Sequence, residues 1–269
     1  MTSGTPVVRR SYLDGPYGQI HLRAVTRPQG GRRPLVCFHL TPGSGRMYEA
    51  LLAEMGADRT AVAPDTPGYG ASDPPPAPPA IGDYAAAMAH VVDRLGLGEV
   101  DLLGYHTGSK IAMELAITRP DLVHRLVLVS APAYTEEEEE RQRRELGAPA
   151  GPRRDGGHLL THWEALLRWQ GLGQTLPLVQ REFAEQLRAG PRAHWGYLAA
   201  FAYRHADHLP RVPRPVLLLC PDDDLRVPTR RARTLLRDGE YREVPWGHGM
   251  ADAHTGELAA LLRGFLDRD

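Results

Sequence analysis

Short apolar runs alternate with helix-like segments along most of this chain of 269 residues. The runs are a few residues long and rich in valine and leucine, whereas the segments between them carry the apolar spacing of amphipathic helices. Strands separated by helices pair in parallel through right-handed crossovers. The pattern therefore predicts an α/β fold with a mostly parallel central sheet flanked by helices. The predicted strands are 17–25, 34–39, 60–64, 100–103, 125–130, 215–220 and 241–244.

The alternation is interrupted once, between residues 133 and 210. This segment opens on the charged helix start TEEEEERQRRE and continues as a helical, aromatic-rich stretch that contains Trp163, Trp169 and Trp195. A chain of this length can bury a single large core. We therefore predict one α/β core made of residues 1–132 and 211–269, with residues 133–210 inserted as a helical cap.

Charge and hydropathy exclude several classes of partner. The formal net charge is −1, with 32 basic and 33 acidic residues, so the chain lacks the basic surface of a nucleic-acid-binding or membrane-surface protein. No run approaches the ~20 apolar residues of a membrane span, and the first residues, MTSGTPVVRR, lack the apolar centre of a signal peptide. We expect a cytoplasmic protein whose partner is a small-molecule substrate, with no nucleic acid and no membrane.

Unusual residues gather in four loops that each follow a predicted strand. These loops are HLTPGSG (39–45), GYHTGS (104–109), PDDDLRVP (221–228) and PWGHGM (245–250). In open parallel sheets, ligands bind in the crevice beyond the carboxyl ends of the strands. The four loops are therefore predicted to form one site.

Together with PDTPGYGASDPP (64–75), these loops follow an order that resembles the α/β-hydrolase fold with a helical cap, over residues 17–266. The resemblance implies a nucleophile elbow at GYHTG, a sharp turn whose tip is usually a serine. Here His106 occupies the tip, between Gly104 and Gly108. The resemblance further implies Asp224 as the acid, three residues before the Val-Pro pair, and His248 as the base that Asp224 orients. It implies no cofactor and no metal.

The same resemblance assigns the groups that would bind an oxyanion. The expected donors are the backbone N–H groups of Thr41 and Thr107. Leu40 stands where the family has a glycine, which changes the shape of this loop. His39 is usually a structural, hydrogen-bonded residue in the family, and we expect the same here.

Two neighbouring assignments follow from local spacing. Ser109 is an alternative nucleophile, but it would lie inside the first helical turn and lack the flanking glycine pair. Asp222 and Asp223 are expected to be turn residues, because aspartates stabilise turns through their own backbone.

Four roles remain open for His106. It could be a nucleophile that forms an acyl-imidazole, or it could share acid and base roles with His248, since two imidazoles in one pocket resist being charged together. The ligand types of a metal site are also present, but the family arrangement puts Asp224 behind His248, so we do not expect them to meet at one ion. The fourth role is in a noncatalytic small-molecule binder.

We predict a cofactor-independent enzyme that acts on a small, hydrophobic, carbonyl-bearing substrate through His106, Asp224 and His248. Shared acid–base chemistry suits a lyase, decarboxylase, cyclase or isomerase. The alternatives are ester, thioester or C–C bond hydrolysis, with His106 as nucleophile or with water activated by His248. Aromatic residues of the cap suit a hydrophobic ligand.

Overall fold

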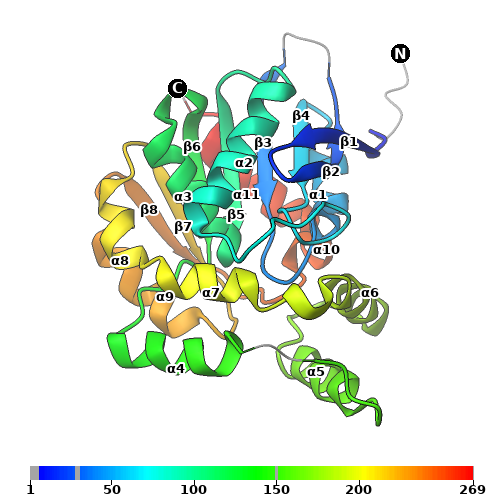
Figure 1. Cartoon of the computed structure of the whole chain (residues 1–269). Coiled ribbons are helices and arrows are strands. Elements are labelled where there is room, and N and C mark those ends of the chain that lie inside the picture. Colours follow the sequence, from blue (N-terminus) through cyan, green and yellow to red (C-terminus); the bar gives the residue numbers. More distant parts are fainter. Residues whose placement is uncertain (1–5, 28–30, 149–150, 269) are drawn as a thin grey trace.

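The computed structural model describes residues 6–27, 31–148 and 151–268. Within them, one eight-stranded sheet runs in the order β1-β2-β4-β3-β5-β6-β7-β8 (Figure 1). Pairing is parallel from β4 to β8, which confirms the predicted α/β class. The strands are β1 (Arg9–Gly15), β2 (Gly18–Val25), β3 (Arg32–Phe38), β4 (Arg59–Pro64), β5 (Val100–Tyr105), β6 (Val123–Val129), β7 (Val216–Cys220) and β8 (Gly239–Glu243).

The edge of the sheet next to β4 is antiparallel and was not fully predicted. β1 and β2 form a hairpin, and β2 joins β4 in the antiparallel sense. Strand β1 lacks a predicted counterpart because its sequence, RRSYLDG, is mostly exposed and shows no apolar face. Its pairing with β2 depends on the backbone, which leaves no hydrophobic pattern in the sequence.

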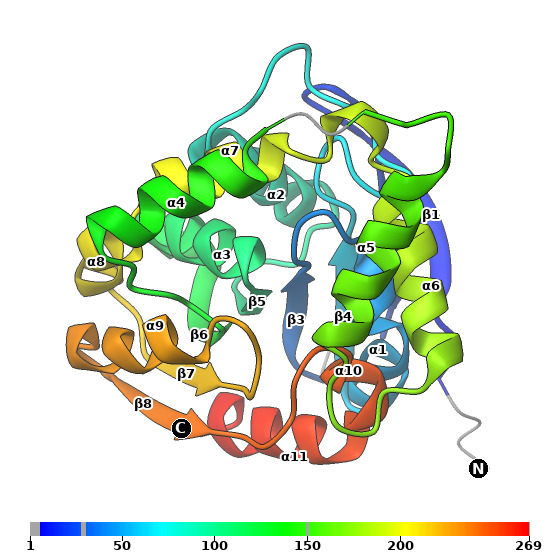
Figure 2. The same cartoon turned by 90° about the horizontal axis from the view of Figure 1, so that it is seen from below.

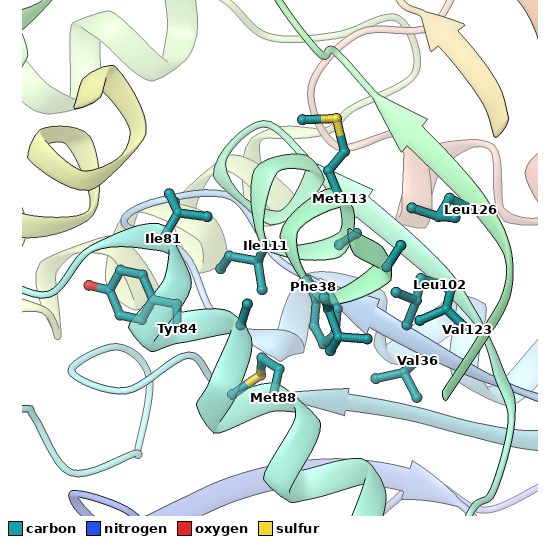
Figure 3. Close-up of a cluster of buried hydrophobic side chains, with 14 of the residues drawn as sticks. Val36, Phe38, Ile81, Tyr84, Met88, Leu102, Ile111, Met113, Val123 and Leu126 are labelled. Carbon is teal, nitrogen blue, oxygen red and sulfur yellow. The ribbon is translucent and has the colours of Figure 1, made fainter. Parts of the chain in front are cut away.

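Alternate residues of the central strands point to opposite faces of the sheet, and each face has its own core. Val36 and Phe38 of β3 lie in a cluster with residues of α2 (Ile81–Arg94) and α3 (Thr107–Thr118), shown in Figure 3. Leu35 and Cys37 lie in the opposite cluster, with residues of α1 (Glu49–Met55) and α11 (Thr255–Leu266). This period of two is what a strand buried on both sides produces.

The segment predicted as a cap contains helices that cross the carboxyl ends of the strands. Viewed from that side, α4 and α7 lie along one flank and α5 and α6 along the other, with the ends of β3 and β5 visible between them (Figure 2). No helix of the described residues is long and apolar enough to cross a membrane. The cap helices are α4 (Glu136–Leu146), α5 (Gly157–Arg168), α6 (Leu176–Leu187), α7 (Trp195–Ala202) and α8 (His205–His208).

Shorter helices complete the connections. After β7 and β8 come α9 (Arg226–Ala232) and α10 (Met250–Ala253). Single turns of 3-10 helix occur at Gly45–Tyr48, Pro120–Leu122, Gly190–Arg192, Leu209–Arg211 and Arg233–Leu235.

The turn from β5 into α3 depends on two glycines that bring three backbone segments together. A Cβ on Gly104 would lie 2.3 Å from the carbonyl oxygen of Gly108, and a Cβ on Gly108 would lie 2.1 Å from that of Phe38. Neither neighbour is a flexible side chain that could move aside. The sequence expectation that both positions must be bare is therefore explained by direct backbone contact between β5, α3 and β3.

We expect Gly108→Ala to lower the free energy of unfolding by ~3 kcal/mol or more, because the added methyl overlaps backbone that cannot give way. Chemical denaturation measures the change. The matched control is Gly264→Ala in α11, where a Cβ meets nothing within 4 Å; it should raise stability by ~0.5–1 kcal/mol. Equal stability of the Gly108→Ala variant and the parent would contradict the close approach described here.

Candidate active site

His106 lies at the tip of the turn between β5 and α3, in a backbone conformation that side chains rarely adopt. Its φ is 50° and its ψ is −113°, and such a conformation costs a non-glycine residue ~1–3 kcal/mol. The His106 N–H donates to the carbonyl of Val129 at 3.0 Å, and its ring packs edge-on against Tyr105 with 4.4 Å between centroids. The strained turn holds the imidazole at the wall of a cavity.

His106 is hydrogen-bonded to Asp223, a residue that sequence reasoning placed in a turn. The distance from His106 Nε2 to Asp223 Oδ2 is 3.2 Å, and the Asp223 side chain is completely buried. The same oxygen accepts from the hydroxyls of Tyr105 at 3.2 Å and Ser130 at 2.5 Å, while Oδ1 accepts from the N–H of Leu225 at 2.9 Å. The expectation for Asp223 was therefore incomplete: it is a buried member of the site.

The charge of Asp223 is stabilised by these donors. Burial raises the pKa of its carboxyl, but the hydrogen bond from His106 and the positive charge that His106 and His248 can carry lower it to about 2. Asp223 is thus ionised throughout the neutral range. A buried carboxylate of this kind fixes the tautomer of its histidine, because it accepts a hydrogen bond from a ring N–H and repels the lone pair of an unprotonated ring nitrogen.

His248 is paired with Asp224, as the resemblance implied. His248 Nε2 lies 2.9 Å from Asp224 Oδ1. Burial lowers the pKa of His248, but the hydrogen bond and charge of Asp224, with Asp223 nearby, raise it to about 8. Burial likewise raises the pKa of Asp224, but the hydrogen bond from His248 and the positive charge that His106 and His248 can carry leave that pKa below its ordinary value. His248 is therefore mostly protonated at neutral pH.

The two histidine–aspartate pairs face each other across a short distance. The rings of His106 and His248 stand 5.2 Å apart at 80°. One ligand atom from each of His106, Asp223, Asp224 and His248 lies within 4.8 Å of the others. The expectation that Asp224 could not converge with both histidines was wrong, because the acid loop carries Asp224 beside the cavity. Two imidazoles and two carboxylates are a donor set that zinc or ferrous iron accepts.

The oxyanion loop is built as expected around His39. His39 Nδ1 donates to the carbonyl of Leu40 at 2.7 Å, and its Nε2 accepts from the N–H of Thr66 at 2.9 Å. The His39 ring is buried and fully hydrogen-bonded, which gives it a structural role. The backbone N–H groups of Thr41 and Thr107 donate to no group in the described residues, so both are free to bind a ligand oxygen. Leu40, Thr41 and Thr107 all line the cavity.

Ser109 does not reach the cavity. Its side chain is buried, and its hydroxyl donates to the carbonyl of His106 at 2.5 Å and lies 3.0 Å from His205 Nε2. The alternative in which Ser109 is the nucleophile therefore has no support in the structure.

The cavity lies between the core loops and the cap, with a volume of about 290 Å³. The core contributes the two histidines and the oxyanion loop, and the cap contributes a mixed wall. Trp169 is the one cap tryptophan on this wall; Trp163 instead packs against Phe183, and Trp195 lies under Arg192. The apolar cap residues on the wall are Leu146, Ala165, Leu166, Trp169, Val179, Ala200 and Phe201.

Two further residues that line the cavity, Lys110 and Glu182, were not predicted from the sequence. Lys110, the only lysine of the chain, is buried one helical turn after His106 and donates to the carbonyl of Tyr203; burial lowers its pKa to about 7. Glu182 of α6 also lines the cavity. Lys110 could have been noted from its position at four residues from His106, but nothing in the pattern of α6 distinguishes Glu182 from a surface glutamate.

Comparison with known proteins places this architecture among characterised folds. The profile of the alpha/beta hydrolase fold matches residues 33–252. A poly(3-hydroxyalkanoate) depolymerase of Ectopseudomonas oleovorans is 23% identical over 256 residues, covering 92% of this chain and 89% of that protein. A putative carbamate hydrolase of Yersinia enterocolitica is 25% identical, with 84% of each chain covered.

Other matches are partial or structural. An uncharacterized protein of Mycobacterium tuberculosis is 30% identical over 115 residues, 43% of this chain, and the match spans only 34% of that protein. Among solved structures, an enol-lactonase from Burkholderia xenovorans has a TM-score of 0.80 at 16% identity, and an esterase from Thermogutta terrifontis has 0.76 at 22%; each alignment covers 96% of this chain, and 100% and 98% of those chains. At such identities the likeness shows the fold.

The Asp224–His248 pair predicts a raised titration midpoint for His248 that a substitution of Asp224 lowers. The Cε1 proton of His248 should titrate with a midpoint of about 8 by NMR, and Asp224→Asn should lower that midpoint by ~1 unit or more. Because the folded pKa is raised, the stability from this pair is complete below the unfolded pKa of ~6.5 and is lost as pH rises through about 8. Asp222→Asn is the control, since Asp222 is exposed and pairs with Arg226. An unchanged midpoint in Asp224→Asn would refute the pairing.

Asp223→Asn should lower the free energy of unfolding by ~2–4 kcal/mol, because the amide cannot accept all four hydrogen bonds of the buried carboxylate. The neighbouring control Asp222→Asn should change it by less than ~0.5 kcal/mol, as expected for an exposed ion pair. Urea denaturation of the two variants at neutral pH measures both. Equal effects would mean that Asp223 is a turn residue after all.

Proposed function

Since the chain belongs to the α/β-hydrolase fold family, we propose that it is an enzyme that uses two histidine–aspartate pairs for acid–base chemistry on a small, largely hydrophobic carbonyl compound, without a cofactor. The observation that carries the proposal is the facing pair of imidazoles at 5.2 Å, each bonded to its own aspartate. The elbow tip bears no hydroxyl, so the groups that can react there are the imidazoles of His106 and His248.

The aspartates decide which ring nitrogens can meet the substrate. Ionised Asp223 and Asp224 accept from Nε2 of His106 and His248, so both Nε2 atoms carry a proton. The Nδ1 atoms make no hydrogen bond to the described residues. Each Nδ1 is therefore the nitrogen that exchanges a proton with a ligand: as a lone pair in neutral imidazole, and as an N–H in imidazolium.

We assign the acid role to His248 and the base role to His106. With its pKa raised to about 8, His248 is the imidazolium at neutral pH and serves as the acid. Because two imidazoles this close resist being charged together, His106 is assigned the role of base. This is the reverse of the division expected from the sequence, in which His248 is the base. The raised pKa of His248 favours the reversed division below pH ~8.

The proposed chemistry begins with removal of a proton next to the substrate carbonyl. His106 Nδ1 takes the proton from carbon, and negative charge develops on the carbonyl oxygen. The free N–H groups of Thr41 and Thr107, together with the Nδ1–H of His248, would stabilise that oxygen. An enolate formed in this way can be reprotonated elsewhere, lose a leaving group or attack a second carbonyl, which are isomerase, lyase and cyclase outcomes.

Hydrolysis is a second candidate, supported by the relatives. The depolymerase and the carbamate hydrolase named above cover most of the chain and are named for hydrolytic reactions. In this reaction, His106 would take a proton from water as the water attacks the carbonyl, and His248 would give its proton to the leaving group. The same two residues act, so the substrate decides between the two outcomes.

NMR in D₂O separates these reactions with two probes, phenylacetone and ethyl phenylacetate. We expect deuterium to enter the α-carbon of phenylacetone, at a rate reduced ~100-fold or more in His106→Gln and in His248→Gln. His90→Gln on α2, outside the cavity, should react as the parent does. Hydrolysis of the ester without exchange of the ketone would favour the second candidate. Binding of both probes with neither reaction would indicate a noncatalytic binder and overturn the proposal.

The pH profile tests the assignment of roles. If His248 is the acid, turnover falls as pH rises through about 8, and Asp224→Asn moves this limb to lower pH. If His248 is the base, turnover instead rises through the same pH. Dialysis against a chelator is the control for the metal-binding alternative: activity that disappears with chelation and returns with zinc would contradict a reaction run by imidazoles alone.

A further inference from the structure

Glu182 presents a carboxylate to the cavity that contains His106 and His248. It lies on α6, and both of its oxygens are held by side-chain amides. Gln174 Nε2 donates to Oε2 at 2.9 Å, and Gln186 Nε2 donates to Oε1 at 3.0 Å. Each glutamine is only 7% exposed and also lines the cavity. Three neighbouring cap residues thus fix one acceptor group in place.

This carboxylate makes no direct ion pair with a cation of the described residues. Among the described residues, no nitrogen of an arginine, lysine or histidine side chain lies within 4.0 Å of a Glu182 carboxylate oxygen. The adjacent charges of α6 are already committed elsewhere: Arg181 pairs with Asp252, and Glu185 pairs with Arg46. An unpaired carboxylate in a partly enclosed site carries a desolvation cost that a cationic ligand would relieve.

The other ionisable groups facing the cavity do not supply the missing charge. His248 is bonded to Asp224, and Lys110 donates to the carbonyl of Tyr203 with its pKa lowered to about 7. His162 also lines the cavity; burial lowers its pKa, so it is neutral, and its Nε2 is buried with no hydrogen-bond partner in the described residues. A positive group on the ligand would find Glu182 as its partner.

The remaining wall suits the body of such a ligand. Apolar cap side chains line the same cavity, and so do Trp169 and Tyr197, whose aromatic rings can bind a cation. A benzoate-like or other anionic ligand would meet the carboxylates of Glu182 and Asp224, while the charge that His248 carries is already paired with Asp224. The charge of the cavity therefore favours one class of molecule: an apolar compound that carries an amine.

We propose that Glu182, held by Gln174 and Gln186, is the subsite that binds a protonated amine on the substrate. The inference rests on the proposed function in taking this cavity as the substrate site, and it adds that the carbonyl compound bears an ammonium group. Glu182 is a specificity-determining residue in this scheme. It accepts a charge-assisted hydrogen bond from the ammonium while the carbonyl lies at the histidines.

Calorimetric titration with benzylamine, benzyl alcohol and benzoate tests the subsite at about pH 8, above the pKa of Lys110. The three probes share one ring and differ in charge. We expect benzylamine to bind the parent protein ~10-fold more tightly than benzyl alcohol, and benzoate to bind most weakly. Glu182→Gln should abolish the preference for benzylamine and strengthen benzoate binding. Glu182→Asp, which keeps the charge, should retain the preference.

Glu164→Gln is the matched control, because Glu164 is an exposed glutamate of the cap outside the cavity. It removes the same charge and should leave all three affinities unchanged. Tighter binding of benzoate than of benzylamine by the parent, or equal losses in Glu182→Gln and Glu164→Gln, would overturn the subsite. Benzylamine has no carbonyl, so this result stands apart from the acid–base reaction: either proposal can fail without the other.

Discussion

The buried carboxylate of Asp223 is the interaction on which the site depends. An ionised group with no exposed surface is stable only where donors surround it. Asp223 follows β7, and its donors come from the ends of neighbouring strands: Tyr105 ends β5, His106 follows it, and Ser130 follows β6. One charge therefore ties three adjacent strand ends into a single arrangement. A serine at the elbow tip would lack the ring N–H that His106 supplies here.

The strained backbone of the elbow is held in place by hydrogen bonds to the charged side chain of Asp223. His106 and Ser130 are the two non-glycine residues with positive φ among those described, and both donate to Asp223. Strain of this kind persists only where surrounding contacts hold it. The hydrogen bonds to a buried carboxylate offset the strain at both positions, and the glycine contacts of Gly104 and Gly108 prevent the turn from relaxing.

Much of the core was predictable, because its strands and helices show hydrophobic periodicity and its loops occur in the order of the family. The strand–helix alternation gives the parallel sheet, and the sequence of loops places His106, Asp224 and His248 together. Asp223 was beyond such reasoning, because three consecutive aspartates in a loop have no periodicity to tell which one points inward. Glu182 could not be predicted either: its helix is held by residues distant in sequence, with Arg46 bound to Glu185 and Asp252 bound to Arg181, and no pattern in α6 reveals which face these contacts cover.

The absence of a hydroxyl at the elbow changes what the retained pair can do. In a serine enzyme the histidine takes the proton of the nucleophile, so it must start neutral. No hydroxyl stands at the elbow tip here, so His248 has no nucleophile proton to take up. Asp224 can then raise the pKa of His248 to about 8, and in the proposed chemistry the charged ring is the acid. Asp223 and Asp224 each bond one histidine, His106 and His248 respectively, so two consecutive residues of one loop orient both rings.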